Sequence, residues 1–188
     1  MRKPAVTSVE IHPVLAERWS PRAFDATAIV KVDDLNAILE AGRWAPSANN
    51  RQPWKFLVAH RGDENFAKMS ELLSGFNKEW APKASALIAA TAITSDAEGN
   101  PIPTALFDLG LAVGLMSVEA HHRGYSIHQM AGFDRDGFKA AFGLSDELNP
   151  VVILALGHVT DATTLSSDVL RDREAAPRER KPLSEILL

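Results

Sequence analysis

Two arginines flank a hydroxyl group near the start of the chain. Arg18 and Arg22 stand four residues apart with Ser20 between them, and Pro21 excludes the interior of a helix. A bent loop would present both guanidinium groups and the hydroxyl together, a set that suits a phosphate or another anion. The alternative interpretation is a surface loop whose arginines pair with neighbouring carboxylates.

A second polar cluster connects a predicted helix to a predicted strand. It runs from Ser47 to Gln52 between Trp44 and Trp54, and it contains three amide side chains. Amides both donate and accept hydrogen bonds, which is what the edge of a heteroaromatic ring with alternating C=O and N groups needs. The alternative is an ordinary polar turn between two tryptophans that anchor the core.

A third group of charges lies in the tail, where Arg178 and Arg180 belong to a charge-dense stretch from 171 to 181. Such a run is usually a solvated face or a disordered end. The short apolar end that follows, residues 186–188, favours docking on another surface such as a partner subunit.

Motifs of self-contained enzymes are missing from the sequence. The histidines His121, His122, His128 and His158 have no partner at metal-ligand spacing, and no GxSxG, GxGxxG or GxxxxGK[ST] pattern occurs. Zero cysteines exclude disulfides, thiolate metal sites and a cysteine nucleophile. We therefore expect neither a catalytic side chain nor a metal site.

Composition indicates one folded domain. The chain has 188 residues, of which 46% are hydrophobic and 23% charged, and its formal net charge of -4 argues against a general nucleic-acid binder. No apolar run approaches the roughly 18 residues of a membrane span. Glu10 and His12 interrupt the only candidate signal peptide, so a soluble, cytoplasmic protein is predicted.

Periodicity places these groups on alternating helices and strands. The spacing predicts helices over 33–44, 64–73, 104–123 and 134–142, and strands over 54–59, 85–94, 125–131 and 151–156. This order predicts an α+β sandwich with a mixed sheet between helices. The helix 104–123 is so apolar that we expect a second subunit to cover it.

Taken in order, the segments resemble the FMN-dependent nitroreductase family from about Glu17 to Leu183. The similar stretches are residues 18–25, 45–54, 132–134, 150–157 and 178–182. The resemblance implies a three-layer α/β/α sandwich with a mixed, mostly antiparallel sheet in an intertwined homodimer. It also implies one FMN-binding domain over 1–188, in which 159–188 is an arm that wraps the partner subunit.

The resemblance further implies which residues contact the flavin. The residues of the first loop would lie along the flavin, and the two tail arginines would close over the flavin's phosphate. The 46–49 segment would reach the second flavin, which is held mainly by the other subunit. A backbone N–H of the 129–132 stretch would lie near the flavin N5. The implied contacts are Arg18, Trp19, Ser20, Arg22, Pro46, Ser47, Ala48, Asn49, Gln52, Asn77, Gln129, Met130, Ala131, Gly132, Arg178 and Arg180.

The implied function is that of an oxidoreductase that uses tightly bound FMN and NAD(P)H to reduce nitroaromatics, quinones or similar acceptors by ping-pong hydride transfer. Because the redox chemistry belongs to the flavin, no protein acid, base or nucleophile is required. A flavin reductase, another flavin-based enzyme or a non-catalytic flavin-binding protein are the alternatives. Two departures from the family are Ala131, where some members carry an acidic residue, and a short 95–103 loop, which predicts an open site.

Overall fold

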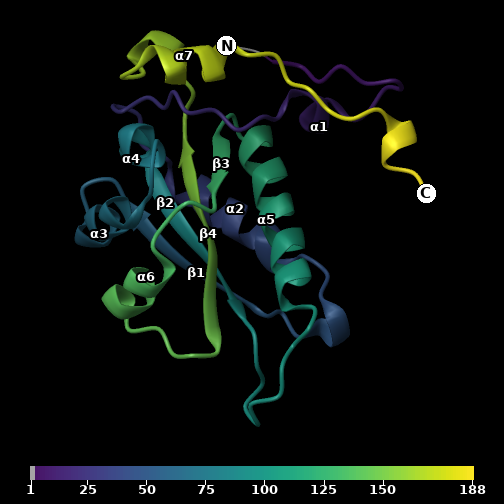
Figure 1. The fold of residues 1–188 in the computed structure, drawn as a ribbon, viewed down its shortest axis with the longest axis vertical. Helices are drawn as coiled ribbons and strands as arrows, with labels where there is room; N and C mark the ends of the chain where they lie inside the picture. The colour runs from purple at the N-terminus through teal and green to yellow at the C-terminus, as the bar shows by residue number, and fades with distance from the viewer. Residues whose placement is uncertain (1–2) are drawn as a thin grey trace.

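The computed structural model describes residues 3–188, with a four-stranded sheet at its centre (Figure 1). Its strands are β1 (Trp54–His60), β2 (Ala86–Ile93), β3 (Ser126–Met130) and β4 (Leu148–Gly157). They lie in the order β1-β2-β4-β3, and each of their three pairings is antiparallel, so this sheet is antiparallel throughout rather than mixed. All four predicted strands are confirmed, and β4 begins three residues earlier than its apolar run because the partly buried Leu148–Pro150 segment also pairs with β2.

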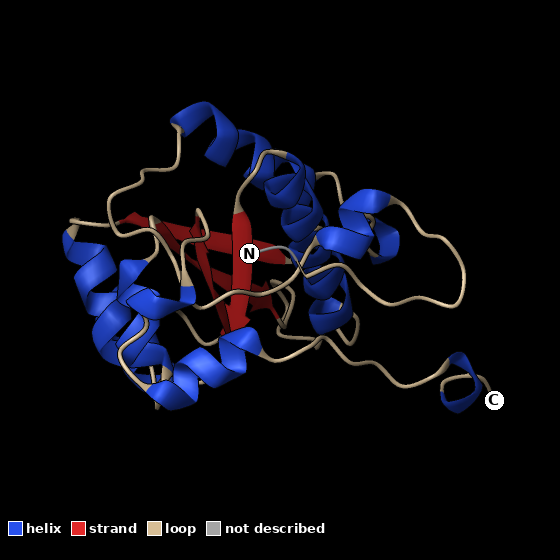
Figure 2. Cartoon of the chain, turned by 90° about the horizontal axis from the view of Figure 1, so that it is seen from above, coloured by secondary structure: helices blue, strands red, loops and turns tan. Residues whose placement is uncertain are grey.

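Helices cover both faces of this sheet, so the predicted three-layer sandwich is confirmed (Figure 2). One face carries α2 (Val32–Arg43) and α5 (Ala105–His122). The other face carries α3 (Glu64–Leu72), α4 (Asn77–Trp80) and α6 (Arg135–Phe142). The predicted helices all occur, whereas the single-turn α4 is too short for its periodicity to show in the sequence.

Strand β2 explains how the two layers share one sheet. Seven of its eight residues are buried, and alternate side chains point to opposite faces. Ile88 and Ala90 pack in the cluster with α2 and α5, while Leu87 and Ala89 pack with α3 and α6. A strand buried on both faces needs apolar residues at every position, which is why this segment shows no alternation.

Helix α5 leaves part of its apolar surface uncovered in the single chain. Leu106 and Phe107 are 53% and 69% exposed, and Leu115 is 40% exposed. Gly42 of α2 lets the opposite side of α5 approach closely, because a Cβ at that position would lie 2.8 Å from Cγ of Met116. Within residues 3–188, no helix is long and apolar enough to cross a membrane.

The two ends of the chain run side by side above the sheet (Figure 1). The N-terminal segment leads into α1 (Pro13–Glu17), and the tail contains α7 (Asp168–Ala175). The sequence did not predict α7, whose first turn is capped by the Ser167 hydroxyl and whose Leu170 and Glu174 are buried. Beyond Arg180 the chain is exposed and ends away from the body of the domain (Figure 2).

Candidate functional site

A strongly basic cavity of about 230 Å³ lies where the N-terminal segment, the loop after α1 and the end of α7 meet. One lysine, five arginines and a single carboxylate are among its lining side chains: Lys3, Arg18, Arg22, Arg173, Arg178, Arg180 and Glu179. The cavity therefore joins the first and third groups of charges that the sequence singled out. Lys3 and Arg173 were not among the predicted contacts: Lys3 belongs to no charged pattern, and Arg173 lies in the charge-dense 171–181 stretch without being distinguished from its neighbours.

The arginine side chains around this cavity form an environment that suits an anion. Burial lowers the pKa of Arg18, and the positive charge of Arg180 lowers it further. The pKa of Arg178 is lowered in the same way, by burial and then by Arg18 and Arg180. Like charges brought this close destabilise one another unless an anion lies between them, so the cluster suits a phosphate.

A buried carboxylate fixes the loop that presents two of these arginines. Glu174, whose side chain is 2% exposed, accepts hydrogen bonds from the backbone N–H groups of Arg22 and Ala23, each at 3.0 Å. Its oxygen also lies 3.9 Å from the Arg22 guanidinium. α7 thereby sets the path of the loop, and the guanidinium of Arg22 remains turned to the cavity.

The N-terminal segment and the tail are tied together across the cavity. The guanidinium of Arg178 donates to the carbonyl oxygens of Lys3 and Ala16, both at 2.6 Å. The ammonium of Lys3 donates to the carbonyls of Glu174 and Ala176. These bonds fix backbone around the cavity, and Arg180 keeps its charge free of any carboxylate among the described residues.

A chain of hydrogen bonds connects the loop to β3 and α5. The Ser20 hydroxyl donates to Oε1 of Gln129 at 3.3 Å, and Nε2 of Gln129 donates to the Ser117 hydroxyl at 2.7 Å. The Ser117 hydroxyl donates in turn to the carbonyl oxygen of Val113 at 2.8 Å. The loop and the end of β3 are therefore held at a fixed separation. The polar side chains that join them, from Ser20 to Gln129, form a polar edge along the end of β3.

The end of β3 also meets the start of α4. Nδ2 of Asn77 donates to the carbonyl of Gly132 at 3.2 Å, and a Cβ at Gly132 would approach that same amide nitrogen to 3.2 Å. Ala131 and Gly132 are exposed, whereas the Met130 side chain is buried in the core. Ala131 and Gly132, rather than the 2% exposed Met130, are therefore open to a ligand that passes along this edge.

His128 serves the site as a packing residue. Its Nδ1 lies 2.8 Å from the carbonyl oxygen of Pro21, which can only accept, so Nδ1 carries a proton. Its ring packs at 4.5 Å from that of Trp80. Burial lowers the pKa of His128 to about 4, so the ring is neutral at pH 7 and holds the loop against β3.

The polar cluster at 46–52 lies elsewhere in the same protomer. It stands at the start of α5, where the N–H of Ala48 donates to Asp108 at 3.3 Å. The N-terminal segment and α7, which line the basic cavity, lie near the opposite end of that helix (Figure 1). Asn49, Asn50 and Gln52 all have positive φ angles of 50–53°. Such backbone is strained for residues other than glycine, and strain of this kind gathers at ligand sites.

Of the predicted contacts, the structure thus brings together Arg18, Trp19, Ser20, Arg22, Arg178 and Arg180, and it joins Ser20 to Gln129 and Asn77 to Gly132. It does not bring the 46–52 cluster to them within one chain. Among the residues that the structure describes, no group of three or more His, Asp or Glu is placed to hold a metal ion.

Comparison with known proteins decides the family. A model of the nitroreductase family matches residues 15–158. The chain belongs to the nitroreductase family. It is 36% identical to an uncharacterized 15.4 kDa protein of Mycolicibacterium smegmatis over 140 residues, which are 70% of this chain and 92% of that protein. It is 24% identical to an oxygen-insensitive NAD(P)H nitroreductase of Salmonella typhimurium, over 80% of this chain and 89% of that one.

Among solved structures, this nitroreductase-family chain is similar to proteins that contain FMN. An oxidoreductase described as containing FMN superposes with a TM-score of 0.92 at 34% identity, covering 98% of this chain and 93% of its own. A protein of Desulfovibrio desulfuricans in complex with FMN superposes with a TM-score of 0.73 at 26% identity, covering 95% and 97%. The family assignment makes this protein an oxidoreductase.

The residues present fit FMN. A phosphate monoester matches a cavity whose cations crowd one another with a single lining carboxylate. The polar edge that follows along Ser20, Gln129 and the exposed backbone of Ala131 and Gly132 provides donors and acceptors for a heteroaromatic ring. Arg18, Arg22, Arg178 and Arg180 would hold the phosphate, and Gln129 with the end of β3 would hold the ring.

Proposed function

We propose that this protein is an FMN-dependent oxidoreductase that uses NAD(P)H to reduce nitroaromatic, quinone or similar acceptors, and that it binds FMN tightly in the basic cavity and along the end of β3. The supporting observation is the cavity itself, which is lined by one lysine and five arginines with a single carboxylate and therefore suits an anion. FMN, when bound, supplies the ring that accepts and returns hydride. The relatives named above are consistent with this chemistry.

In this proposal the chain itself binds and orients rather than reacts. The arginines hold the phosphate, and hydrogen-bond donors at the ring edge stabilise negative charge where it grows on reduction. His128 is neutral and bonded to Pro21, so it supplies no proton to the site. NAD(P)H and the acceptor would use the same open face in turn, which gives ping-pong kinetics.

The functional unit in this proposal is a homodimer with flavin at the subunit interface. The exposed apolar side chains of α5 support it, because a patch of this kind usually marks a contact surface. The distance of the Pro46–Gln52 segment from the basic cavity supports it too, since that segment would serve the partner's flavin. The 159–188 segment, whose end beyond Arg180 is exposed, would be the arm that wraps the partner, as part of one domain over 1–188 in a cytoplasmic protein.

The visible spectrum of the purified protein, followed by stopped-flow mixing with NADH and NADPH, tests the function. Flavin absorbance should be present at about one per chain, should fall on mixing with at least one donor, and should return when a quinone or nitroaromatic is added. A colourless preparation that does not take up FMN would overturn the flavin site. Bound flavin that neither donor bleaches would overturn the reductase function.

The short 95–103 loop, which turns at Gly99 and is exposed, bears on the range of acceptors. A short loop leaves little chain to roof the site, so we propose a broad acceptor range. Comparing kcat/KM over a panel of nitroaromatics and quinones tests this, and one strongly preferred small substrate would contradict it.

A further inference from the structure

One arginine of the basic cavity is held differently from the others. Arg173 lines the cavity from α7, but within residues 3–188 its guanidinium forms no hydrogen bond and no ion pair. It is exposed, whereas Arg18, Arg22 and Arg178 are half-buried. What holds it is an aromatic ring, because the guanidinium lies over Phe76 at 4.8 Å from the ring centre.

Phe76 places this guanidinium near the edge along which the flavin ring would lie. The next residue, Asn77, donates from its amide to the carbonyl of Gly132 at 3.2 Å, and the N–H of Ser74 donates to the same carbonyl at 2.9 Å. The turn that carries Phe76 is therefore fixed to the end of β3. Arg173 consequently lies at a rim that faces the basic cavity on one side and approaches the proposed ring site on the other.

Two contacts hold α7 against α4 at this rim. The hydroxyl of Ser166, just before α7, donates to the carboxylate of Glu79 in α4 at 2.7 Å, and Arg173 packs on Phe76. A guanidinium over an aromatic face keeps N–H donors at its own edge, and no described residue accepts from those of Arg173. The Phe76 ring is 41% exposed, so the pair is open to a ligand.

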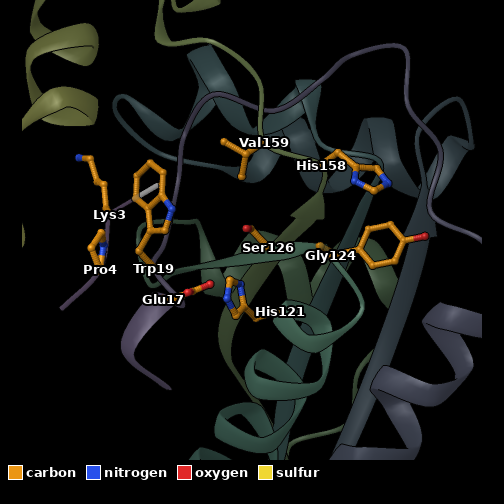
Figure 3. Close-up of a pocket in the computed structure, with 10 residues that line it drawn as sticks. Lys3, Pro4, Glu17, Trp19, His121, Gly124, Ser126, His158 and Val159 are labelled. Atoms are coloured by element: carbon orange, nitrogen blue, oxygen red, sulfur yellow. The ribbon is translucent and has the colours of Figure 1, made fainter. Parts of the chain in front are cut away.

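Lys3 is the other cation of the cavity that the flavin phosphate does not use, and it is already bonded. Its ammonium donates to the carbonyls of Glu174 and Ala176 and lies 4.7 Å from the centre of the Trp19 ring. Lys3 and Trp19 also line a second cavity, of about 440 Å³, in whose wall they lie next to each other (Figure 3). Arg173 is therefore the cation whose donors remain open once the flavin phosphate has its four arginines.

The two nicotinamide donors differ in a group that such a cation would recognise. NADPH carries a phosphate monoester on the 2′-oxygen of its adenosine ribose, where NADH has a hydroxyl. A phosphate monoester has about two negative charges at neutral pH. Arginine matches phosphate with paired N–H donors, and an arginine close to the ribose can accommodate the 2′-phosphate of NADP.

We propose that the Phe76–Arg173 pair binds the 2′-phosphate of NADPH and makes NADPH the preferred donor. The nicotinamide would lie on the open face of the flavin, and the adenosine end would reach the rim between α4 and α7. This inference rests on the proposed function and names the donor within it. Hydride transfer is the same with either donor, so the pair acts on the affinity for the donor alone.

Titration of the oxidised, FMN-loaded protein with NADP⁺ and with NAD⁺ tests the proposal without turnover. The wild type should bind NADP⁺ about tenfold or more tightly than NAD⁺, the scale of a hydrogen bond to a charged group. The preference should shrink as the salt concentration rises, because the pair is exposed. Arg173→Ala should abolish the preference while NAD⁺ affinity stays within about twofold, and Arg173→Lys should retain part of it.

Two further variants separate the ring contact from a general effect of charge. Phe76→Leu keeps an apolar side chain but removes the aromatic face, so NADP⁺ affinity should fall about two- to fivefold. Arg171→Ala is the matched control, because it removes the same charge from α7 two residues away. Arg171 pairs with Asp168 at 2.7 Å and does not line the basic cavity, so both affinities should stay unchanged.

The outcomes separate this proposal from the proposed function. Equal affinities of the wild type for NADP⁺ and NAD⁺, or the same loss of preference in Arg171→Ala as in Arg173→Ala, would overturn the donor site. A tenfold fall in FMN affinity in Arg173→Ala would assign Arg173 to the flavin phosphate, and would overturn the donor site while the FMN site stands. Protein that takes up no FMN, or bound flavin that neither donor bleaches, would overturn the proposed function itself.

Discussion

Glu174 accepts the backbone N–H of Arg22 with both of its carboxylate oxygens, each at 3.0 Å. The contact joins residues that are 152 positions apart in the sequence, and one oxygen also accepts from the N–H of Ala23. A negative charge is thus buried beneath a cavity lined by six cationic side chains. It shapes the loop that supplies Arg18 and Arg22 without itself facing the cavity.

Glu174→Ala should lower both flavin affinity and stability. Removal of the carboxylate leaves two buried N–H groups without a partner, which costs about 2–3 kcal/mol of unfolding free energy. The loop is then free to move, so FMN affinity should fall about tenfold, and Glu174→Gln, which keeps one accepting oxygen, should restore part of it. Urea unfolding and flavin titration measure the two effects.

Met69→Ala, which truncates a fully buried side chain of α3, is the control. It should lower the free energy of unfolding by a similar amount with no change in FMN affinity. Equal losses of FMN affinity in both variants would refute a positioning role for Glu174.

His128 should make stability depend on pH. Its pKa falls from 6.5 in the unfolded chain to about 4 in the fold, so the unfolded state binds the proton more readily between those values. Its contribution is complete above pH 6.5 and is lost as pH falls toward 4, by about 3 kcal/mol in all. Urea unfolding of wild type and His128→Gln at several pH values between 4 and 7.5 measures this. The difference between their stabilities should shrink as pH falls, and parallel curves would show that His128 does not titrate as described.

The sequence predicted the sandwich well because its strongest patterns are local. Helix 105–122 and strand 86–93 are long, apolar and bounded by turn residues, so their type and length follow from the chain itself. Helix α7 was missed because only Leu170 and Glu174 of its eight residues are buried. A charged residue is one of those two, so no apolar stripe marks the helix.

The candidate site was predictable only in part. The arginines at 18, 22, 178 and 180 are visible as charge clusters, and the structure brings them to one cavity. Lys3, Arg173 and Glu174 could not be assigned, because each acts through contacts across more than 150 residues of chain or through the turn of a helix that the sequence did not predict. Contacts of this kind produce no regular residue spacing in the sequence from which they could be predicted.

Arg18→Ala and Arg180→Ala should each weaken FMN binding by about 1.5–3 kcal/mol, the value of a hydrogen bond to a charged group. Stability should rise or stay level in the flavin-free protein, because each change relieves repulsion that lowers the pKa of its neighbours. Arg18→Lys should retain part of the affinity. Flavin titration with thermal unfolding of the apoprotein checks both effects, and Lys68→Ala on α3, outside the cavity, serves as the control. Unchanged FMN affinity in both alanine variants would show that the flavin phosphate binds outside this cavity.

Asp108→Ala should disturb the flavin site of the partner subunit if the Pro46–Gln52 segment serves it. Asp108 is 2% exposed and accepts from the Ala48 N–H at 3.3 Å and the Thr104 hydroxyl at 3.0 Å, so its loss frees a segment that already contains three residues with positive φ. We expect FMN affinity to fall about tenfold although the substituted residue lies near the opposite end of α5 from the basic cavity. Asp161→Ala is the control, because Asp161 accepts from the N–H group of Thr163 in the turn before α7 and does not line the basic cavity. Flavin titration of the two variants, with their oligomeric state measured by light scattering, distinguishes the cases: equal affinity in a wild-type-like dimer would place the Pro46–Gln52 segment away from the flavin.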